Sequence, residues 1–179
     1  KKGDKNSVNV RMISGDHLET CVWVAKEAGI ISGTEAASSK AVMTGEKFRE
    51  KIGYYMEGNF RKENYTINPD TNEVFFVRIQ VFQEVARHVR VIARATDEDK
   101  LLLVEGIKQG GGVPLVSGDC IADARALKAA RVGISMGTGC QVAKENSDLV
   151  ILNNEFQSIY QSIMWGRTIY ENVRKFIQF

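Results

Sequence analysis

The sequence predicts an α/β fold in which a mostly parallel sheet lies between two layers of helices. Short apolar runs, typical of buried parallel strands, alternate along the chain with longer segments of helical periodicity. Glycine and polar residues separate these segments, and one pattern of strand, Ser-Gly-Asp turn and helix occurs twice. Such alternation favours parallel strands joined by right-handed crossovers, which give a three-layer sandwich.

Six apolar runs are the predicted strands. They are residues 8–13, the start of 41–48, 90–93, 113–116, 132–135 and 149–152. Helical periodicity predicts a helix over 17–28, where Gly29 follows as a C-terminal glycine. Thr96 and the acidic residues after it form a strong start for a helix that runs to Gln109. The other predicted helices are 79–88, the segment after Asp119, 141–146 and 156–179.

Residues 53–75 lack a clear period and are rich in turn residues and aromatics, which predicts a surface insertion. Two interpretations of its aromatic residues stay open. They pack against one another within the insertion, or they pair with Arg61 and Lys62 as a docking surface. The aromatic residues concerned are Tyr54, Tyr55, Phe60 and Tyr65.

The composition limits the class of protein. A chain of 179 residues that is 44% hydrophobic can bury one good core, with the last helix appended to it. A formal net charge of +2 argues against nucleic acid as the main partner. No apolar run reaches the length of a membrane span, so we expect this segment to be soluble. Three widely spaced cysteines fit reduced thiols.

The second Ser-Gly-Asp turn suggests a metal site. Asp119 ends a predicted buried strand, and Asp123 follows about one helical turn later, so both carboxylates can face the crevice above the strand ends. Two carboxylates at such a place suit Mg²⁺, which binds through few protein oxygens and keeps its waters. Taken alone, however, this turn is more typical of carboxylates that cap a helix and complement its dipole.

The first such turn, Ser14-Gly15-Asp16, makes a capping role alone a weaker explanation. Exposed amides at a helix start bind anions, and a serine hydroxyl adds a donor for a phosphate oxygen. Lys100 lies in the first turn of the helix that follows the strand 90–93. A lysine there can offset the negative charge of a phosphoryl centre, although it also fits a solvated helix face.

These motifs resemble those of the haloacid dehalogenase-like phosphotransferases, and most closely the phosphorylation domain of P-type cation-transporting ATPases. VRMISGDHLETCVWVAKEAGI resembles V-x-M-x-T-G-D-x-x-x-T-A-x-x-I-A-x-x-x-G-I of that family. VSGDCIADARALKAARVGISMG resembles T-G-D-G-x-N-D-x-P-A-L-K-x-A-D-V-G-I-A-M-G. MWGR and TGEKFRE are similar to the plasma-membrane calcium-pump subfamily. The resemblance covers nearly the whole chain apart from 53–75.

The resemblance implies a Rossmann-like core over 1–155, as part of a phosphorylation domain, and a helix over 156–179 that leads toward a membrane stalk. It places this segment at the cytosolic face of a membrane. It implies that Asp119 binds Mg²⁺, and that Lys100 and Asp123 are the catalytic residues. Asp123 would orient Asp119 and Lys100. The residues implied to bind the phosphoryl group are Ser14, Gly15 and Asp16.

In the family, an aspartate in D-K-T-G-T on the first strand receives the γ-phosphate of ATP, and no such motif occurs in this sequence. The resemblance therefore implies that this nucleophile strand is missing and that the chain, which begins with Lys1, is an inactive fragment. In the parent protein, Mg²⁺ and ATP would be the cofactors. The implied partners are ATP, the transported cation, a nucleotide-binding domain, an actuator domain and membrane helices.

Three departures lie within the signature, where Cys120, Ala122 and Arg125 replace glycine, asparagine and proline. They leave open a degenerate, non-catalytic module that binds Mg²⁺ or a partner. A soluble sugar or nucleotide phosphatase would share Ser14 and Lys100, but it does not explain the final helix. The leading hypothesis is a piece of an ATP-driven pump, with Ca²⁺ as the ion that the subfamily resemblance suggests.

Overall fold

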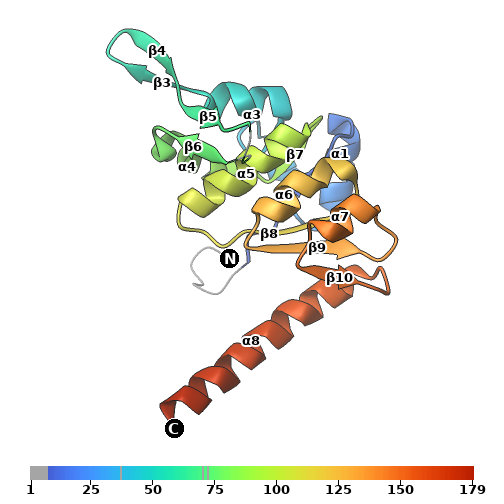
Figure 1. The fold of residues 1–179 in the computed structure, drawn as a ribbon. Helices are drawn as coiled ribbons and strands as arrows, with labels where there is room; N and C mark the ends of the chain where they lie inside the picture. The colour runs from blue at the N-terminus through green and yellow to red at the C-terminus, as the bar shows by residue number, and fades with distance from the viewer. Residues whose placement is uncertain (1–7, 37, 70, 72) are drawn as a thin grey trace. The chain divides into compact units, whose positions relative to one another are not determined.

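The chain forms two compact units, residues 1–113 and 114–179. The structure is a computed structural model that describes residues 8–36, 38–69, 71 and 73–179 (Figure 1). Each unit has a parallel sheet of three strands. The predicted α/β class with parallel strands is confirmed, although the described strands form two parallel sheets and two antiparallel hairpins instead of a single sheet.

The sheet of the first unit has the strand order β1-β7-β2. Its strands are β1 (Met12–Ile13), β7 (Val91–Ala93) and β2 (Val42–Thr44), and both pairings are parallel. β1 is much shorter than the predicted 8–13. Val8 and Val10 are largely exposed, and β7 pairs with only the last two residues of the run. The apolar run is therefore longer than the strand that finds a partner.

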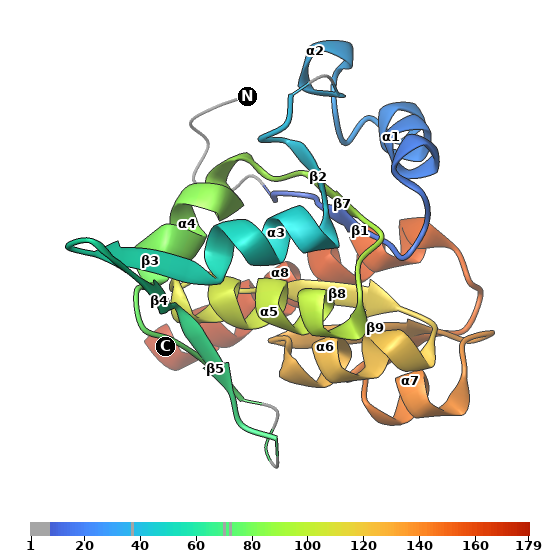
Figure 2. The ribbon, with the colours of Figure 1, turned by 90° about the horizontal axis from the view of Figure 1, so that it is seen from above.

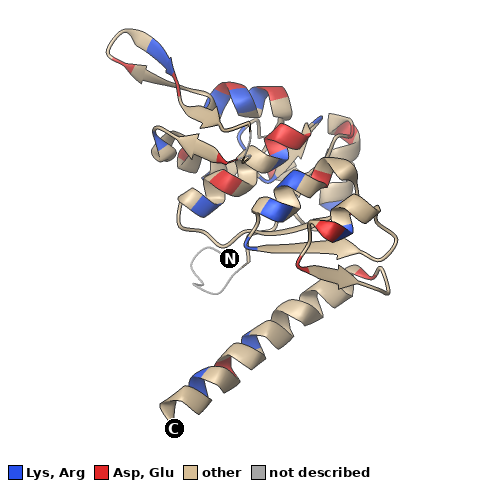
Figure 3. Ribbon diagram, viewed as in Figure 1, with Lys and Arg blue, Asp and Glu red and all other residues tan. Residues whose placement is uncertain are grey.

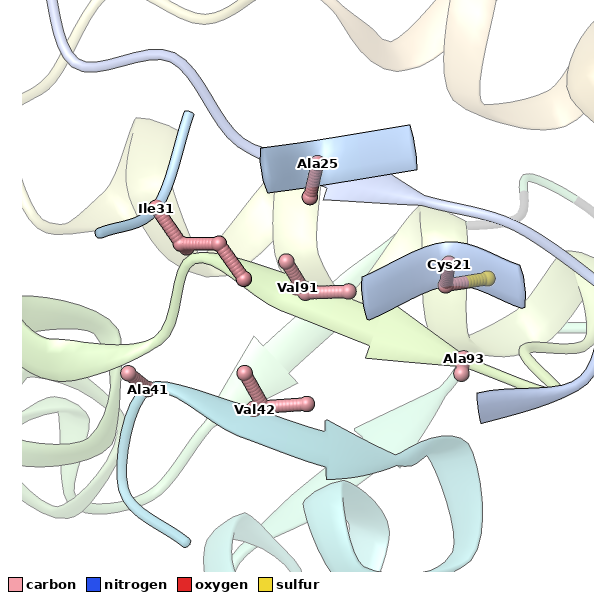
Figure 4. Packing of buried hydrophobic residues seen from close by; sticks show 7 residues of the cluster. All are labelled: Cys21, Ala25, Ile31, Ala41, Val42, Val91 and Ala93. Atoms are coloured by element: carbon pink, nitrogen blue, oxygen red, sulfur yellow. The ribbon is translucent and has the colours of Figure 1, made fainter. Parts of the chain in front are cut away.

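Helix α1 (Leu18–Glu27) covers one face of this sheet with small side chains. Cys21 and Ala25 are fully buried and pack with Val91 and Ala93 of β7 (Figure 4). The cluster also contains Ile31, Ala41 and Val42. Small residues on the helix allow its backbone to approach the strands closely. The helix and the short sheet can therefore form a packed core between them.

After α1 the chain reverses at Gly29, whose φ of +68° is the left-handed conformation that glycine adopts without strain. A short helix follows, α2 (Gly33–Ala36), and strand β2 then leads into α3 (Gly45–Ile52). The sequence predicted only a strand and turn over 41–48. Helix α3 is short and charged, and it buries just two large side chains, Phe48 and Ile52. With 8 residues, the helix is shorter than the window over which helical periodicity is recognised.

Residues 53–76 form two antiparallel hairpins. Strands β3 (Tyr54–Glu57) and β4 (Phe60–Glu63) pair in one hairpin, which extends away from the neighbouring helices in Figure 1, and β5 (Tyr65–Ile67) and β6 (Val74–Phe76) pair in the other. Of the aromatic residues in question, Tyr65 packs against Phe76, at 5.8 Å between ring centroids. Phe60 is largely exposed, and the rings of Tyr54 and Tyr55 each lie against an arginine guanidinium. Arg61 lies 3.9 Å from the ring centroid of Tyr54.

Two longer helices complete the first unit, α4 (Ile79–His88) and α5 (Asp97–Gln109), both within the predicted bounds. Phe82 of α4 is buried and lies against Gly106 of α5, where a built Cβ would approach the Phe82 ring to 2.4 Å. A glycine in mid-helix is unfavourable in itself, so its value here is the close approach of the two helices.

The second unit has the strand order β10-β9-β8, and again all pairings are parallel. Its elements are β8 (Leu115–Gly118), the 3-10 turn η1 (Ile121–Asp123), α6 (Ala124–Ala129), β9 (Val132–Met136), α7 (Gln141–Glu145), β10 (Leu149–Ile151) and α8 (Phe156–Gln178). Ile134, Ile151 and Ile159 form its core cluster, with Ile163 packed against it.

Helix α8 is 23 residues long and buries only Ile159. Its charged residues begin at Arg167, and the first half of the helix carries none (Figure 3). Several large apolar side chains are exposed beyond that point, among them Ile169, Phe176 and Ile177. None of the helices in the described part of the chain is long and apolar enough to span a bilayer.

We expect Gly106→Ala to lower the free energy of unfolding by about 1–3 kcal/mol, since the new methyl group would overlap the Phe82 ring. Gly166→Ala in α8 is the matched control, because a built Cβ there has no described atom within 4 Å. The control should stabilise its helix by up to about 1 kcal/mol. Urea unfolding followed by circular dichroism measures both, and equal stability of Gly106→Ala and the unchanged chain would contradict the packing.

Candidate functional site

The Ser14-Gly15-Asp16 turn follows β1 directly and is closed by its own side chains. The Asp16 amide donates to Ser14 Oγ at 3.2 Å, and Ser14 Oγ donates to Asp16 Oδ2 at 3.0 Å. Gly15 and Asp16 are exposed. The turn is therefore accessible from solvent. An anion that accepts a hydrogen bond from the Ser14 hydroxyl would have to displace the Asp16 carboxylate, which accepts that hydrogen bond in this structure.

Backbone hydrogen bonds tie this turn to the loop between β7 and α5. The Ser14 amide donates to Ile92 O at 3.0 Å, the Ala95 amide donates to Ser14 O at 2.9 Å, and the Arg94 amide donates to Asp16 O at 2.9 Å. Helix α5 begins three residues after Arg94 and carries half-buried Lys100 in its first turn. The Ser14 turn and the start of the Lys100 helix thus lie at the carboxyl edge of one sheet, as predicted for parallel strands.

Arg94 is a further polar residue at this edge that was not predicted from the sequence. Its φ of +48° is the left-handed conformation, which is uncommon for a residue with a side chain. Its guanidinium Nη2 lies 3.1 Å from the ring nitrogens of His17, at the start of α1. A strained backbone beside two phosphate-binding candidates is the kind of feature that concentrates at functional sites. No local sequence signal predicts it.

The first turn of α5 is anchored by a buried ion pair. Asp99 is fully buried, and its Oδ2 accepts from Arg49 Nη1 at 2.5 Å, from the Thr96 amide at 2.8 Å and from Thr96 Oγ1 at 3.0 Å. The Asp99 amide in turn donates to Thr96 Oγ1, which completes a capping box. The predicted helix start is confirmed. Arg49 of α3, the partner of Asp99 in the ion pair, is 50 residues away in the sequence and was not predicted.

A second long-range contact reaches the same turn from the hairpins. The Tyr65 hydroxyl donates to Glu98 Oε1 at 3.4 Å. Burial, and then the neighbouring Glu98 carboxylate, raise the pKa of Tyr65 to about 12. Two consecutive residues of the α5 start, Glu98 and Asp99, are therefore each bonded to a residue from 45–67.

The Asp119 turn in the second unit is organised by Asp123. Asp123 Oδ2 accepts from the amides of Asp119 and Cys120, both at 3.2 Å. Gly118 makes this possible, since a built Cβ would lie only 2.5 Å from Asp123 Cβ. The Cys140 amide donates to Asp119 O at 2.8 Å and braces the turn from the opposite side. The capping interpretation of Asp123 is thus partly realised, because its carboxylate closes the turn.

The Asp119 carboxylate, by contrast, faces solvent at the carboxyl end of β8. One ligating atom each from Asp119, Cys120 and Asp123 lies within 4.8 Å of the others. The Cys120 thiol donates to Asp119 Oδ1 at 3.2 Å. Exposed carboxylate oxygens fit Mg²⁺, which binds few protein oxygens and keeps its waters, so the residues present suit the metal that the sequence suggested.

The predicted site residues therefore fall into two groups. Ser14, Gly15, Asp16 and the helix start before Lys100 are linked through hydrogen bonds at one sheet edge of the first unit. Asp119 and Asp123 are linked to each other in the second unit. The roles of these residues in catalysis stay predictions. The prediction that both groups act on one phosphoryl group also stays a prediction.

Comparison with known proteins adds an independent line of evidence. The chain is 39% identical over 176 residues to calcium-transporting ATPase 7, plasma membrane-type, of Oryza sativa subsp. japonica, and 38% identical over 173 residues to calcium-transporting ATPase 9, plasma membrane-type, of Arabidopsis thaliana. It is 36% identical over 173 residues to calcium-transporting ATPase 2 of Saccharomyces cerevisiae. These alignments cover 96–98% of the chain.

The chain spans 14% of the length of the two plant relatives and 12% of the yeast relative. No protein-family model matches it. A solved structure of the catalytic domain of the CPx-ATPase CopB-B has 28% sequence identity and a TM-score of 0.41, and the match covers 47% of this chain and 33% of that one. The sequence relatives alone therefore carry the comparison.

We expect Asp123→Ala to loosen the Asp119 turn, because the amides of Asp119 and Cys120 lose their shared acceptor. Each lost hydrogen bond is worth about 1 kcal/mol, so exchange of these two amides with deuterium should quicken by about tenfold or less. Asp123→Asn keeps one oxygen acceptor and is the control, with slow exchange retained. Unchanged exchange in Asp123→Ala would show that other contacts hold the turn.

The raised pKa of Tyr65 predicts a pH dependence. The folded state favours the neutral phenol, so its contribution to stability is complete below the ordinary pKa of 10.0 and is lost as the pH rises through about 12. The difference in unfolding free energy between the unchanged chain and Tyr65→Phe should shrink over that interval. Difference absorbance of ionised tyrosine provides the direct check, and titration of Tyr65 near pH 10 would contradict the contact with Glu98.

Proposed function

Because the chain belongs by sequence to the family of plasma-membrane-type calcium-transporting ATPases, we propose that it is part of the cytosolic phosphorylation domain of an ATP-driven pump. The transported ion would be Ca²⁺, as in the names of these relatives. The observation that carries the proposal is the alignment of almost the entire chain with calcium-transporting ATPases. The two Ser-Gly-Asp turns, which resemble the phosphoryl-binding motifs of P-type ATPases, support it.

The geometry supports the proposal within each unit. Both turns stand at the carboxyl ends of parallel strands, each on an edge strand of its own sheet, β1 and β8. We propose that the aspartate that accepts the phosphoryl group comes from the parent protein outside this chain, on the D-K-T-G-T strand typical of the family. In that arrangement the Ser14 turn and the Asp119 turn act on the same phosphoryl group.

Each residue has a role that its surroundings permit. The Lys100 ammonium would offset charge on the phosphoryl oxygens, and the Ser14 hydroxyl and Gly15 amide would donate to them. The Asp119 carboxylate would ligate Mg²⁺, whose positive charge would lower the repulsion between the phosphoryl oxygens and the attacking carboxylate. Asp123 would keep the Asp119 turn in shape through the two amides that it already binds. Transfer of this kind needs mainly position and charge from the protein.

We further propose that residues 1–155 belong to the phosphorylation domain and that 156–179 lead toward the membrane. The long helix α8 is buried only at Ile159, and its later apolar side chains are exposed, as expected of a helix that continues into other parts of a pump. ATP, a nucleotide-binding domain, an actuator domain and membrane helices would be the partners, all within the parent protein.

The second candidate is a non-catalytic binding module, and the departures in the signature favour it. Ala122 is exposed beside Asp119 and lacks the amide that the family has there, and Arg125 replaces a proline. The Asp119 turn itself stays closed in spite of these changes. That closure is compatible with both candidates, since a binding module that holds Mg²⁺ would also need this turn.

Phosphorylation of the parent protein tests the proposal. The parent reading frame should contain an upstream D-K-T-G-T, and membranes that contain the full-length protein should form an acid-stable phosphoenzyme from labelled ATP and Mg²⁺. Lys100→Ala and Asp119→Ala should each slow its formation by about a hundredfold or more, because each removes charge compensation at the transferring group. Lys108→Ala, in the same helix and paired with Glu105, is the control.

Two results would contradict the pump and favour the binding module. One is a parent sequence without the D-K-T-G-T strand. The other is a full-length protein that forms no phosphoenzyme from labelled ATP and Mg²⁺. Phosphoenzyme formation in Lys100→Ala at the rate of the Lys108→Ala control would instead contradict the role proposed for Lys100.

A further inference from the structure

We infer that Arg49 is a positioning residue for Lys100, acting through the buried ion pair with Asp99. The inference rests on the proposed function, since it assigns a support to the lysine that would face the phosphoryl group. It adds a residue from α3 that touches neither the phosphoryl group nor the metal in that proposal. Helices α3 and α5 lie side by side in Figure 2, in agreement with the ion pair that joins them.

The burial of the pair makes it a strong constraint. The Asp99 side chain is completely buried, while the Arg49 side chain is one-third exposed. A buried carboxylate without a cation is costly, so the free energy of the folded state depends on Arg49 staying in place. Asp99 Oδ1 accepts no hydrogen bond from the described residues, so the contacts with Arg49 and Thr96 all fall on Oδ2.

Lys100 immediately follows Asp99 and lies in the first turn of α5, the part of a helix that is most easily distorted. Its backbone amide donates to Thr96 O at 3.3 Å, so it depends on the same cap. If Asp99 left its buried position, the first turn would have to rotate or unwind. Lys100 would move with it, because the two residues share one turn of backbone.

Gly45 shows that α3 is fitted to this place. A built Cβ at Gly45 would lie 2.3 Å from Asp99 Oδ2 and 3.0 Å from Arg94 O. The start of α3 therefore touches both the Asp99 carboxylate and the loop that binds the Ser14 turn through Arg94 and Ala95. One helix thus supports the two segments of the first unit that carry phosphate-binding candidates.

A double-mutant cycle on phosphoenzyme formation by the full-length protein tests the inference. Arg49→Met keeps most of the side-chain stem and removes the guanidinium. We expect it to slow phosphoenzyme formation by tenfold to about a hundredfold, the effect of a misplacement near 1 Å, with little change in the apparent affinity for ATP. Arg49→Lys, which retains the charge, should restore part of the rate. In a Lys100→Ala background, Arg49→Met should cause no further loss.

A second variant separates position from stability. Arg49→Met combined with Asp99→Asn removes the unpaired charge, while the oxygen of the new side-chain amide can still accept from the Thr96 backbone amide. The thermal stability of the 179-residue chain should therefore largely return. Phosphoenzyme formation should stay slow, because the guanidinium that fixed the turn is absent.

Two results would overturn the inference. One is recovery of both stability and rate in the Arg49→Met, Asp99→Asn variant, which would show a purely structural role. The other is a loss from Arg49→Met of equal size with and without Lys100. A normal rate in Lys100→Ala alone would instead overturn the role that the proposed function gives to Lys100, and a full-length protein that forms no phosphoenzyme would overturn the proposed function itself, so the failures are distinguishable.

Discussion

Backbone hydrogen bonds from the Ser14 turn to β7 and the loop after it are the interactions on which the first unit's candidate site depends. They join a turn near the start of the chain to a segment some 80 residues later, at 2.9–3.0 Å. Parallel pairing of β1 with β7 brings the two segments to the same sheet edge, and these bonds fix them there. These hydrogen bonds therefore also help to position the start of α5, which carries Lys100.

The second unit solves the same problem with a carboxylate. Here a side chain, and not the backbone of a neighbouring loop, holds the turn. One oxygen of Asp123 accepts hydrogen bonds from the amides of Asp119 and Cys120, and Gly118 leaves room for the Asp123 side chain. The Asp119 side chain is thereby left exposed at the end of β8. In each unit, then, one acidic residue, Asp99 or Asp123, fixes a turn next to a charged residue that we propose acts on the ligand.

Local signals in the sequence predicted much of this. The bounds of α4 and α5, the Thr96 cap and the parallel strands follow from periodicity, capping residues and apolar runs, all of which act over a few residues. The Ser-Gly-Asp turns were predictable because their residues are adjacent. Helix α3 and the two hairpins were not, because α3 is only 8 residues long and because the pairing of the hairpin strands depends on their neighbours.

Arg49 and Arg94 illustrate what no local pattern supplies. Arg49 is one of several charged residues in a short segment, and only the fold selects it as the partner of Asp99. Arg94 adopts a positive φ that its residue type disfavours, so the reason lies in its bonds to Asp16 and His17. Each arginine makes a long-range contact with a residue whose role was predicted. Asp99 belongs to the predicted helix start, and Asp16 to the predicted phosphate-binding turn.

We propose that the two Ser-Gly-Asp turns and Lys100 act on one phosphoryl group. A structure of the full-length protein with Mg²⁺ and a beryllium fluoride mimic of the phosphoryl group tests it most directly. The account predicts Ser14 Oγ and Lys100 Nζ at about 3 Å from the fluorides, and an Asp119 oxygen coordinated to Mg²⁺. It is contradicted if the mimic and the metal bind elsewhere, with Ser14, Lys100 and Asp119 apart and none of them in contact with either.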